Sequence, residues 1–216
     1  MHPNAFLRTF WRLEVRPHVF VAMSFRPDYL ARYHEVIVPA VTSLTVGGTA
    51  LSPYRVDTSQ SGDSILTDIV EGIAHSQLIL AGLSSVGNDS HTGESFRNGN
   101  VMYEVGVALA CRQPHDVLLV RDDKDKFLFD VSTIPHMTID FTDVVAARAA
   151  LNGALAARLQ EQTYVNDARV RIAVASLSNT ELTLLTELAV LPEGVARGQG
   201  LALTVLQLTR RQSWGC

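Results

Sequence analysis

Runs of apolar residues alternate with mixed segments over most of the chain. Nearly continuous apolar runs occupy residues 19–25, 78–81 and 116–120, and such runs are typical of parallel strands buried on both faces of a sheet. Shorter strand patterns surround residues 54–57 and 136–141. The sequence therefore predicts five strands.

The segments between these runs carry apolar residues at helical spacing. This spacing predicts helices at residues 29–44, 65–73, 100–109 and 144–159. Pro39 lies inside the first of them and predicts a kink or an early end. Alternating strands and helices favour an α/β fold, a doubly wound, flavodoxin-like parallel sheet with helices on both faces.

The pattern divides the chain into three parts. Residues 1–17 form an amphipathic amino-terminal segment, residues 18–163 an α/β domain, and residues 164–216 a small helical appendage. In the appendage, Ser178-Asn-Thr-Glu181 has the form of a capping box that opens a leucine-rich helix. A second helix is expected at about residues 200–211.

Composition narrows the range of partners and compartments. The 216 residues carry a net charge of −4, with lysine only at positions 124 and 126, so the chain has no positive field for nucleic acid and we expect no such partner. Cys111 and Cys216 have neither a metal-ligand spacing nor a disulfide pattern, so we expect no metal and a reducing cytoplasm. We find no signal peptide and no apolar stretch long enough to span a membrane.

Glu104 is the leading candidate for chemistry. With Asn100 as the expected helix cap, Glu104 falls in the first turns of its helix, where the helix dipole favours an ionised carboxylate. Such a carboxylate can attack or stabilise a cationic sugar carbon. The alternative is that Glu104 merely complements the dipole. Gly106 is expected to let this helix approach a strand or a ligand closely.

Two aspartates precede Glu104 at or near the same predicted edge of the sheet. Ligands of doubly wound sheets bind beyond the carboxyl ends of the strands, where Asp57 and Asp68 are expected. Cleaving an N-glycosidic bond requires an anion under the anomeric carbon and a group that manages the proton of the base, and Glu104 with Asp68 supplies such a pair. Asp57 could accept a hydrogen bond from a ribose hydroxyl. The alternatives are a surface helix residue for Asp68 and a turn residue for Asp57.

Three segments together resemble one enzyme superfamily. Phe20-Val-Ala-Met-Ser-Phe25, Asp68 in its helix, and Asn100-Val-Met-Tyr-Glu-Val-Gly-Val-Ala-Leu109 look like the nucleoside 2-deoxyribosyltransferases and their Toll/interleukin-1 receptor (TIR)-like relatives. The resemblance covers about residues 19–141, and its most specific part is similar to the segment that holds the catalytic glutamate of those enzymes. It implies that Glu104 is the nucleophile or the charge partner of an oxocarbenium-like state, and that Asp68 handles the leaving base or its proton.

The resemblance also bears on substrate binding. In those enzymes an aspartate a few residues before the glutamate helps to bind the substrate, whereas Asn98 and Asn100 occupy that neighbourhood here. Tyr103 is expected to shape the sugar pocket or to cover the sheet edge. The expected substrate-binding residues are Met23, Ser24, Phe25, Asp57, Asn98, Asn100 and Tyr103.

Three functions follow as hypotheses. The first is an enzyme that cleaves or transfers the N-glycosidic bond of a nucleoside, a nucleotide or NAD, with no cofactor and with NAD as a possible substrate. The second is a catalytically silent nucleotide-binding sensor, and the third is an oligomerising TIR-like signalling module. A homo-oligomer is expected because the resemblance implies that a neighbouring copy completes the pocket. The amino-terminal segment also offers an apolar surface, formed by Phe6, Phe10, Trp11 and Leu13.

Overall fold

The computed structural model describes residues 15–56, 65–125 and 134–189, and the chain divides into two compact units, Met1–Tyr164 and Val165–Cys216. The first unit contains a parallel sheet and the helices that cover it. Most of the predicted amino-terminal segment lies outside the described residues, as do Asp57 and the helix expected at 200–211.

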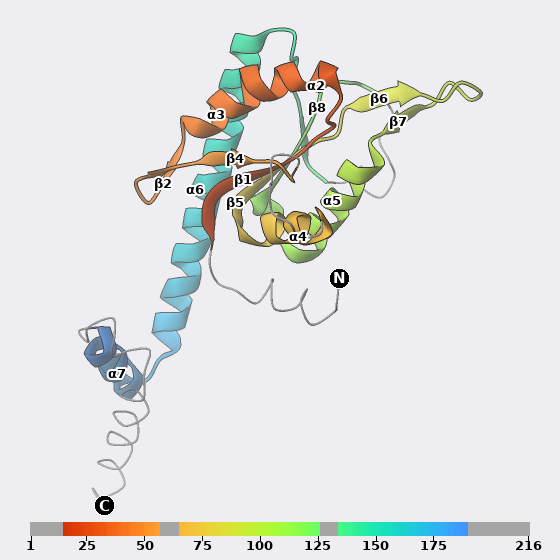
Figure 1. Ribbon diagram of the computed structural model, residues 1–216. Helices are drawn as coiled ribbons and strands as arrows, with labels where there is room; N and C mark the ends of the chain where they lie inside the picture. Colours follow the sequence, from red (N-terminus) through yellow and green to blue (C-terminus); the bar gives the residue numbers. More distant parts are fainter. Residues whose placement is uncertain (1–14, 57–64, 126–133, 190–216) are drawn as a thin grey trace, which may run out of the picture. The chain divides into compact units, whose positions relative to one another are not determined.

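The central sheet confirms the predicted fold class. Its five strands are all parallel and follow the order β4-β1-β5-β8-β9, which is 2-1-3-4-5 when these strands are numbered along the chain (Figure 1). The strands are β1 (Arg16–Ala22), β4 (Ser52–Tyr54), β5 (Ser76–Gly82), β8 (Val117–Arg121) and β9 (His136–Thr138).

Both faces of the sheet are covered, which explains the apolar runs. Val19 and Val21 of β1 point into one core, while Phe20 and Ala22 point into the other. The first core is closed by α2 (Pro27–Arg32), a π-helical turn (Tyr33–Ile37), α3 (Val38–Thr42) and α6 (Val144–Ser176). The second is closed by α4 (Ile65–His75) and α5 (Gly99–Cys111), which lie on the opposite side of the sheet in Figure 1.

Pro39 does not end its helix. Proline lacks an N–H, so the carbonyl of Glu35, four residues earlier, loses its helical donor. The chain widens into the π-helical turn just before Pro39, and the guanidinium of Arg148 in α6 donates to the Glu35 carbonyl at 2.8 and 3.2 Å. The expected irregularity is therefore present, but the early end is wrong because a neighbouring helix replaces the missing donor.

A glycine brings a helix close to the sheet, although it is not Gly106. A Cβ atom on Gly72 of α4 would lie 2.5 Å from the ring of Phe20 and 2.8 Å from that of Tyr54. Gly106 is exposed, and a Cβ atom there would meet no described atom within 4 Å. The close approach to a strand expected at Gly106 is thus wrong, because α4 makes that approach at Gly72 instead. An approach of Gly106 to a ligand stays a prediction.

Arg112 joins α5 to the elements beside it. This residue caps the carboxyl end of α5, and its Nη1 donates to the carbonyls of Ile73 at 2.9 Å and Ser76 at 2.8 Å. Its Nε donates to Asp116 at 3.0 Å, just before β8. Arg112 therefore fixes the far end of the helix that carries Glu104.

The last described helices differ in how well the sequence predicted them. α6 extends to Ser176, well beyond the expected end at residue 159. α7 (Asn179–Ala189) begins with the expected capping box: Ser178 Oγ accepts from the Glu181 N–H at 3.3 Å, and the Glu181 carboxylate accepts from the Ser178 N–H at 2.7 Å. Within the described ranges, no helix combines the length and apolar character needed to cross a membrane.

Candidate functional site

The topology marks one edge of the sheet as the place for a ligand. The connection that follows β1 leads to β4 on one side, and the connection that follows β5 leads to β8 on the other. Doubly wound proteins bind ligands at the point where the crossovers diverge in this way, which here is at the carboxyl ends of β1 and β5. Ser24 follows β1 at this edge, and the chain leaving β5 leads to α5.

Asn98 fixes the start of α5 near this edge of the sheet. Its Oδ1 accepts hydrogen bonds from the N–H groups of Asn100 at 3.0 Å and Val101 at 3.3 Å, and its Nδ2 donates to the buried Ser24 Oγ at 3.5 Å. The N-cap is thus Asn98, and the expectation that Asn100 caps the helix is wrong. The side chain of Asn100 is exposed. Their roles in substrate binding remain predictions.

Glu104 lies on the buried face of α5. It shares this face with Val101, Val105 and Ala108, which pack into the core beneath the helix. The residue is 9% exposed, and its carboxylate forms no hydrogen bond or ion pair with the described part of the chain. A largely buried carboxylate without such partners is poorly solvated in its charged form.

The electrostatics of Glu104 differ from the expectation. Glu104 is the sixth residue of α5, beyond the first turn where the dipole acts, so the predicted stabilisation of its charge is wrong. Burial instead raises the pKa of Glu104 from 4.5 to about 7. Both protonation states are therefore populated near neutral pH, which suits a group that acts as an anion or exchanges a proton.

Asp68 lies on the helix next to Glu104. α4 and α5 pack against each other on the same face of the sheet (Figure 1), and Asp68 is partly exposed near the start of α4. The structure thus brings the two helices together. That the two carboxyl groups share one cleft remains a prediction.

The other expected binding residues differ in exposure. Met23 is buried in the core beside α2 and the π-helical turn, whereas Phe25 and Tyr103 are half-exposed. Phe25 lies against the guanidinium of Arg55, which is 4.9 Å from the Phe25 ring centre and 4.4 Å from that of Tyr33. Sequence reasoning missed Arg55, which is buried just after β4 although arginine is usually exposed.

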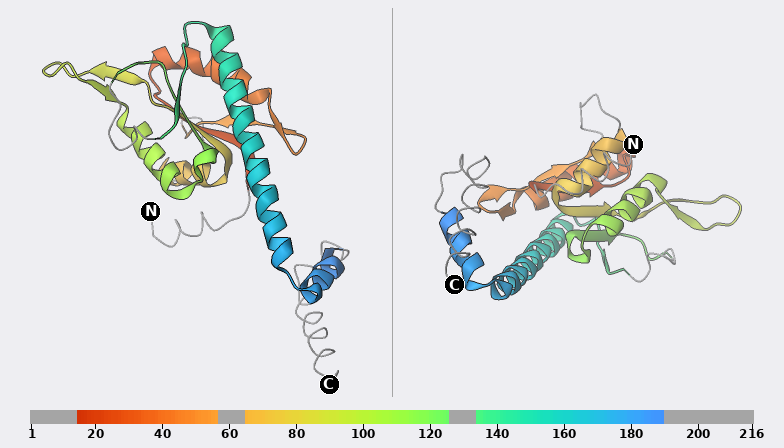
Figure 2. Two further views of the ribbon diagram at one scale, coloured as in Figure 1. Left: turned by 180° about the vertical axis from the view of Figure 1, so that it is seen from behind. Right: turned by 90° about the horizontal axis from the view of Figure 1, so that it is seen from below.

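The expected long loop before α5 is a β-hairpin. β6 (Ser85–Asn88) pairs with β7 (Ser95–Arg97), and Figure 2 shows the hairpin projecting from the amino-terminal end of α5. Asp123, which follows β8, holds the two ends of this hairpin together. Its carboxylate accepts hydrogen bonds from Arg97 and from the N–H of Ser85. Burial alone would raise the pKa of Asp123, but these hydrogen bonds and the charges of Arg97 and Arg121 lower it to about 2.

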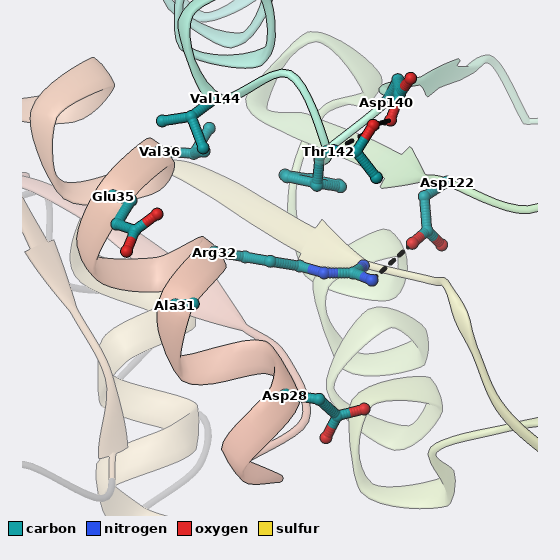
Figure 3. A pocket seen from close by; sticks show the side chains of 10 residues that line it. Asp28, Ala31, Arg32, Glu35, Val36, Asp122, Asp140, Thr142 and Val144 are labelled. Carbon is teal, nitrogen blue, oxygen red and sulfur yellow. Dashed lines mark hydrogen bonds and ion pairs between the residues drawn. The ribbon is translucent and has the colours of Figure 1, made fainter.

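A separate pocket of about 360 Å³ opens beyond β8 and β9 (Figure 3). Arg32 extends across it and forms an ion pair with Asp122 at 2.6 Å, and three further carboxylates, Asp28, Glu35 and Asp140, line it. The pocket is bounded by α2 and the start of α6, on the face of the sheet opposite Glu104. It is therefore distinct from the Glu104 site.

The sequence matches no protein-family model and no curated protein. The family resemblance therefore remains an expectation.

Proposed function

We propose that this protein cleaves the N-glycosidic bond of a nucleoside, a nucleotide or NAD, or transfers the sugar to a second base, with Glu104 as the catalytic carboxylate. One observation carries the proposal: a buried carboxylate, without a partner among the described residues, lies on a helix that begins at the ligand-binding edge of the sheet. A protein does not bury such a group for stability, because its desolvation is unfavourable.

Glu104 would act on the sugar. As the base departs, positive charge develops at the anomeric carbon, and a carboxylate beneath it either stabilises this charge or attacks the carbon to form a glycosyl ester. Weak hydration strengthens the attraction between the Glu104 anion and the cationic carbon. The same attraction favours the ionised form once substrate is bound, so a pKa of about 7 in the free protein is compatible with the role.

Asp68 would manage the proton of the leaving base. A purine leaves as an anion unless it is protonated, whereas nicotinamide leaves as a neutral molecule from a ring that is already cationic. Asp68→Asn should therefore slow the cleavage of a purine nucleoside more than that of NAD. Equal slowing of both substrates would remove Asp68 from this role.

The test of the function is direct. The full-length protein is incubated with purine and pyrimidine nucleosides, their 5′-monophosphates and NAD, with and without a second free base, and the released base is measured by chromatography. Release without an acceptor indicates hydrolysis, and release that requires an acceptor indicates transfer. If no substrate in this panel is cleaved, the proposal fails, and binding of the same compounds would then favour a sensor.

We further propose that the protein works in the cytoplasm as a homo-oligomer. The aromatic residues that motivate this assembly lie outside the described residues, and the proposal rests on their sequence pattern. Light scattering at micromolar concentration should give a mass above that of one chain, and a monomer with and without nucleotide would contradict it.

A further inference from the structure

The start of α5 is fixed by the residue before its cap. Arg97 ends β7, directly before Asn98, and its side chain is 4% exposed. Its Nη1 donates a hydrogen bond to the carbonyl of Leu83, just after β5. The guanidinium also donates to both carboxylate oxygens of Asp123. The place where α5 begins is therefore set by groups at the ends of β5 and β8.

Asp123 is the centre of this arrangement. Its Oδ1 accepts from Arg97 at 2.8 Å and from Arg121 at 2.6 Å, and its Oδ2 accepts from Arg97 and, at 2.8 Å, from the N–H of Ser85. A carboxylate held by two guanidinium groups and a backbone N–H has a defined orientation. Asp123 thus connects β8 with both strands of the hairpin that leads to α5.

We infer that Asp123, acting through Arg97, positions the first turn of α5 at the sheet edge, and with it Asn98 and the catalytic carboxylate of Glu104. The inference rests on the function proposed for Glu104. Asp123 is a positioning residue, because it acts on Glu104 through Arg97 and the start of α5. Its loss would release the hairpin from β8 and allow water to reach the buried face of α5.

The neighbouring residue provides a matched control. Asp122 also forms an ion pair with an arginine, Arg32, at 2.6 Å, but it does so on the opposite face of the sheet. Asp122→Asn removes the same charge one position earlier in the chain and leaves the contacts of Arg97 in place. A general effect of charge or stability would therefore affect both variants, whereas positioning of α5 would affect Asp123→Asn.

The experiment measures the protonation of Glu104 in the full-length protein. The infrared band of its protonated carboxyl group is identified by its absence in Glu104→Gln, and its intensity is followed against pH in the wild type, Asp123→Asn and Asp122→Asn. In Asp123→Asn the midpoint of the Glu104 titration should fall by about one pH unit or more, toward the ordinary pKa of a hydrated glutamate. With a substrate that the wild type cleaves, kcat should fall roughly 10- to 100-fold and KM should change less.

Each outcome decides the inference. Asp122→Asn should leave the midpoint and kcat unchanged, and a folded Asp123→Asn protein with the wild-type midpoint would overturn the inference. If Asp123→Asn does not fold, Arg97→Lys keeps the charge but loses the paired contact, and it should lower the midpoint in the same direction; an unchanged midpoint there would equally overturn it. If the wild type cleaves no substrate, the proposed function fails, and the midpoints still decide whether Asp123 positions Glu104.

Discussion

Replacing Glu104 with Gln should stabilise the protein, and by more at higher pH. Gln keeps the shape of the side chain and removes the charge that burial disfavours. In the native state the pKa of Glu104 is about 7, whereas in the unfolded chain it returns to about 4.5. The native state therefore retains a proton that the unfolded chain has already lost between these two values.

The sign and size of the effect follow from this difference. The contribution of Glu104 to stability is fully present below pH 4.5, declines as the pH rises, and becomes constant above the native pKa of about 7. At about 1.4 kcal/mol per pH unit, the wild type loses about 3 kcal/mol relative to Glu104→Gln across this window. The pH-dependent part of the difference in free energy of unfolding between Glu104→Gln and the wild type should thus be smallest near pH 4.5 and largest above pH 7.

The assay is urea denaturation of both proteins, followed by circular dichroism between pH 5 and pH 9. The quantity of interest is the difference in free energy of unfolding between Glu104→Gln and the wild type. Glu94→Gln is the control, because Glu94 is an exposed residue of the β6–β7 hairpin and its replacement should give a difference that does not change with pH. A Glu104→Gln difference that is flat with pH, or that shrinks toward pH 8, would refute the burial of an uncompensated carboxylate.

The remaining predictions concern the helices that carry the candidate site. Gly72→Ala should destabilise the protein by about 2 kcal/mol or more, because the new methyl group overlaps the buried ring of Phe20. Gly106→Ala should instead stabilise it by about 1 kcal/mol, because alanine favours the helix and meets no neighbouring atom there. Equal effects of the two substitutions in thermal denaturation would contradict the helix packing. Asn98→Ala should cost about 1 kcal/mol of stability through loss of the α5 cap, and Asn100→Ala should cost little. Hydrogen exchange of the backbone N–H groups at the start of α5 distinguishes the two variants. Faster exchange in Asn100→Ala than in Asn98→Ala would reverse the assignment of the cap.

The sequence predicted the sheet well because its inner strands are buried on both faces. The apolar runs in β1, β5 and β8 follow from that burial, and the alternation with helices led to the correct fold class. The edge strand β4 was harder to place, since it has three residues, all partly exposed, and includes Pro53. Its predicted range was shifted toward the following loop.

The environment of Glu104 was predicted less well, although part of the signal was present. The spacing of Val101, Val105 and Ala108 predicts the buried face of α5, and Glu104 falls on that face. Choosing Asn100 as the cap moved Glu104 closer to the helix start and made the dipole seem dominant. Asn98 precedes a glycine and gives no stronger local signal than Asn100, so the pattern alone does not identify the residue whose side chain accepts from the first N–H groups of α5.

Long-range side-chain contacts explain most of what the sequence did not reveal. Arg97 and Asp123 are 26 positions apart, and no periodicity relates them. Gly72 and Gly106 both lie inside helices, and they differ in what faces them, since Phe20 stands opposite Gly72. Local patterns therefore predicted the elements, whereas the partners of individual side chains required the assembled fold.

The most direct test of the central claim compares the wild type with Glu104→Gln on a nucleoside, nucleotide or NAD that the wild type cleaves. Substrate binding, measured by calorimetry, should survive in the variant, because the shape and hydrogen-bonding capacity of the side chain are largely kept. The rate of base release should fall by about a hundredfold or more, because the variant lacks the anion that supports the sugar carbon. Full activity of Glu104→Gln on every substrate that the wild type cleaves would contradict the account.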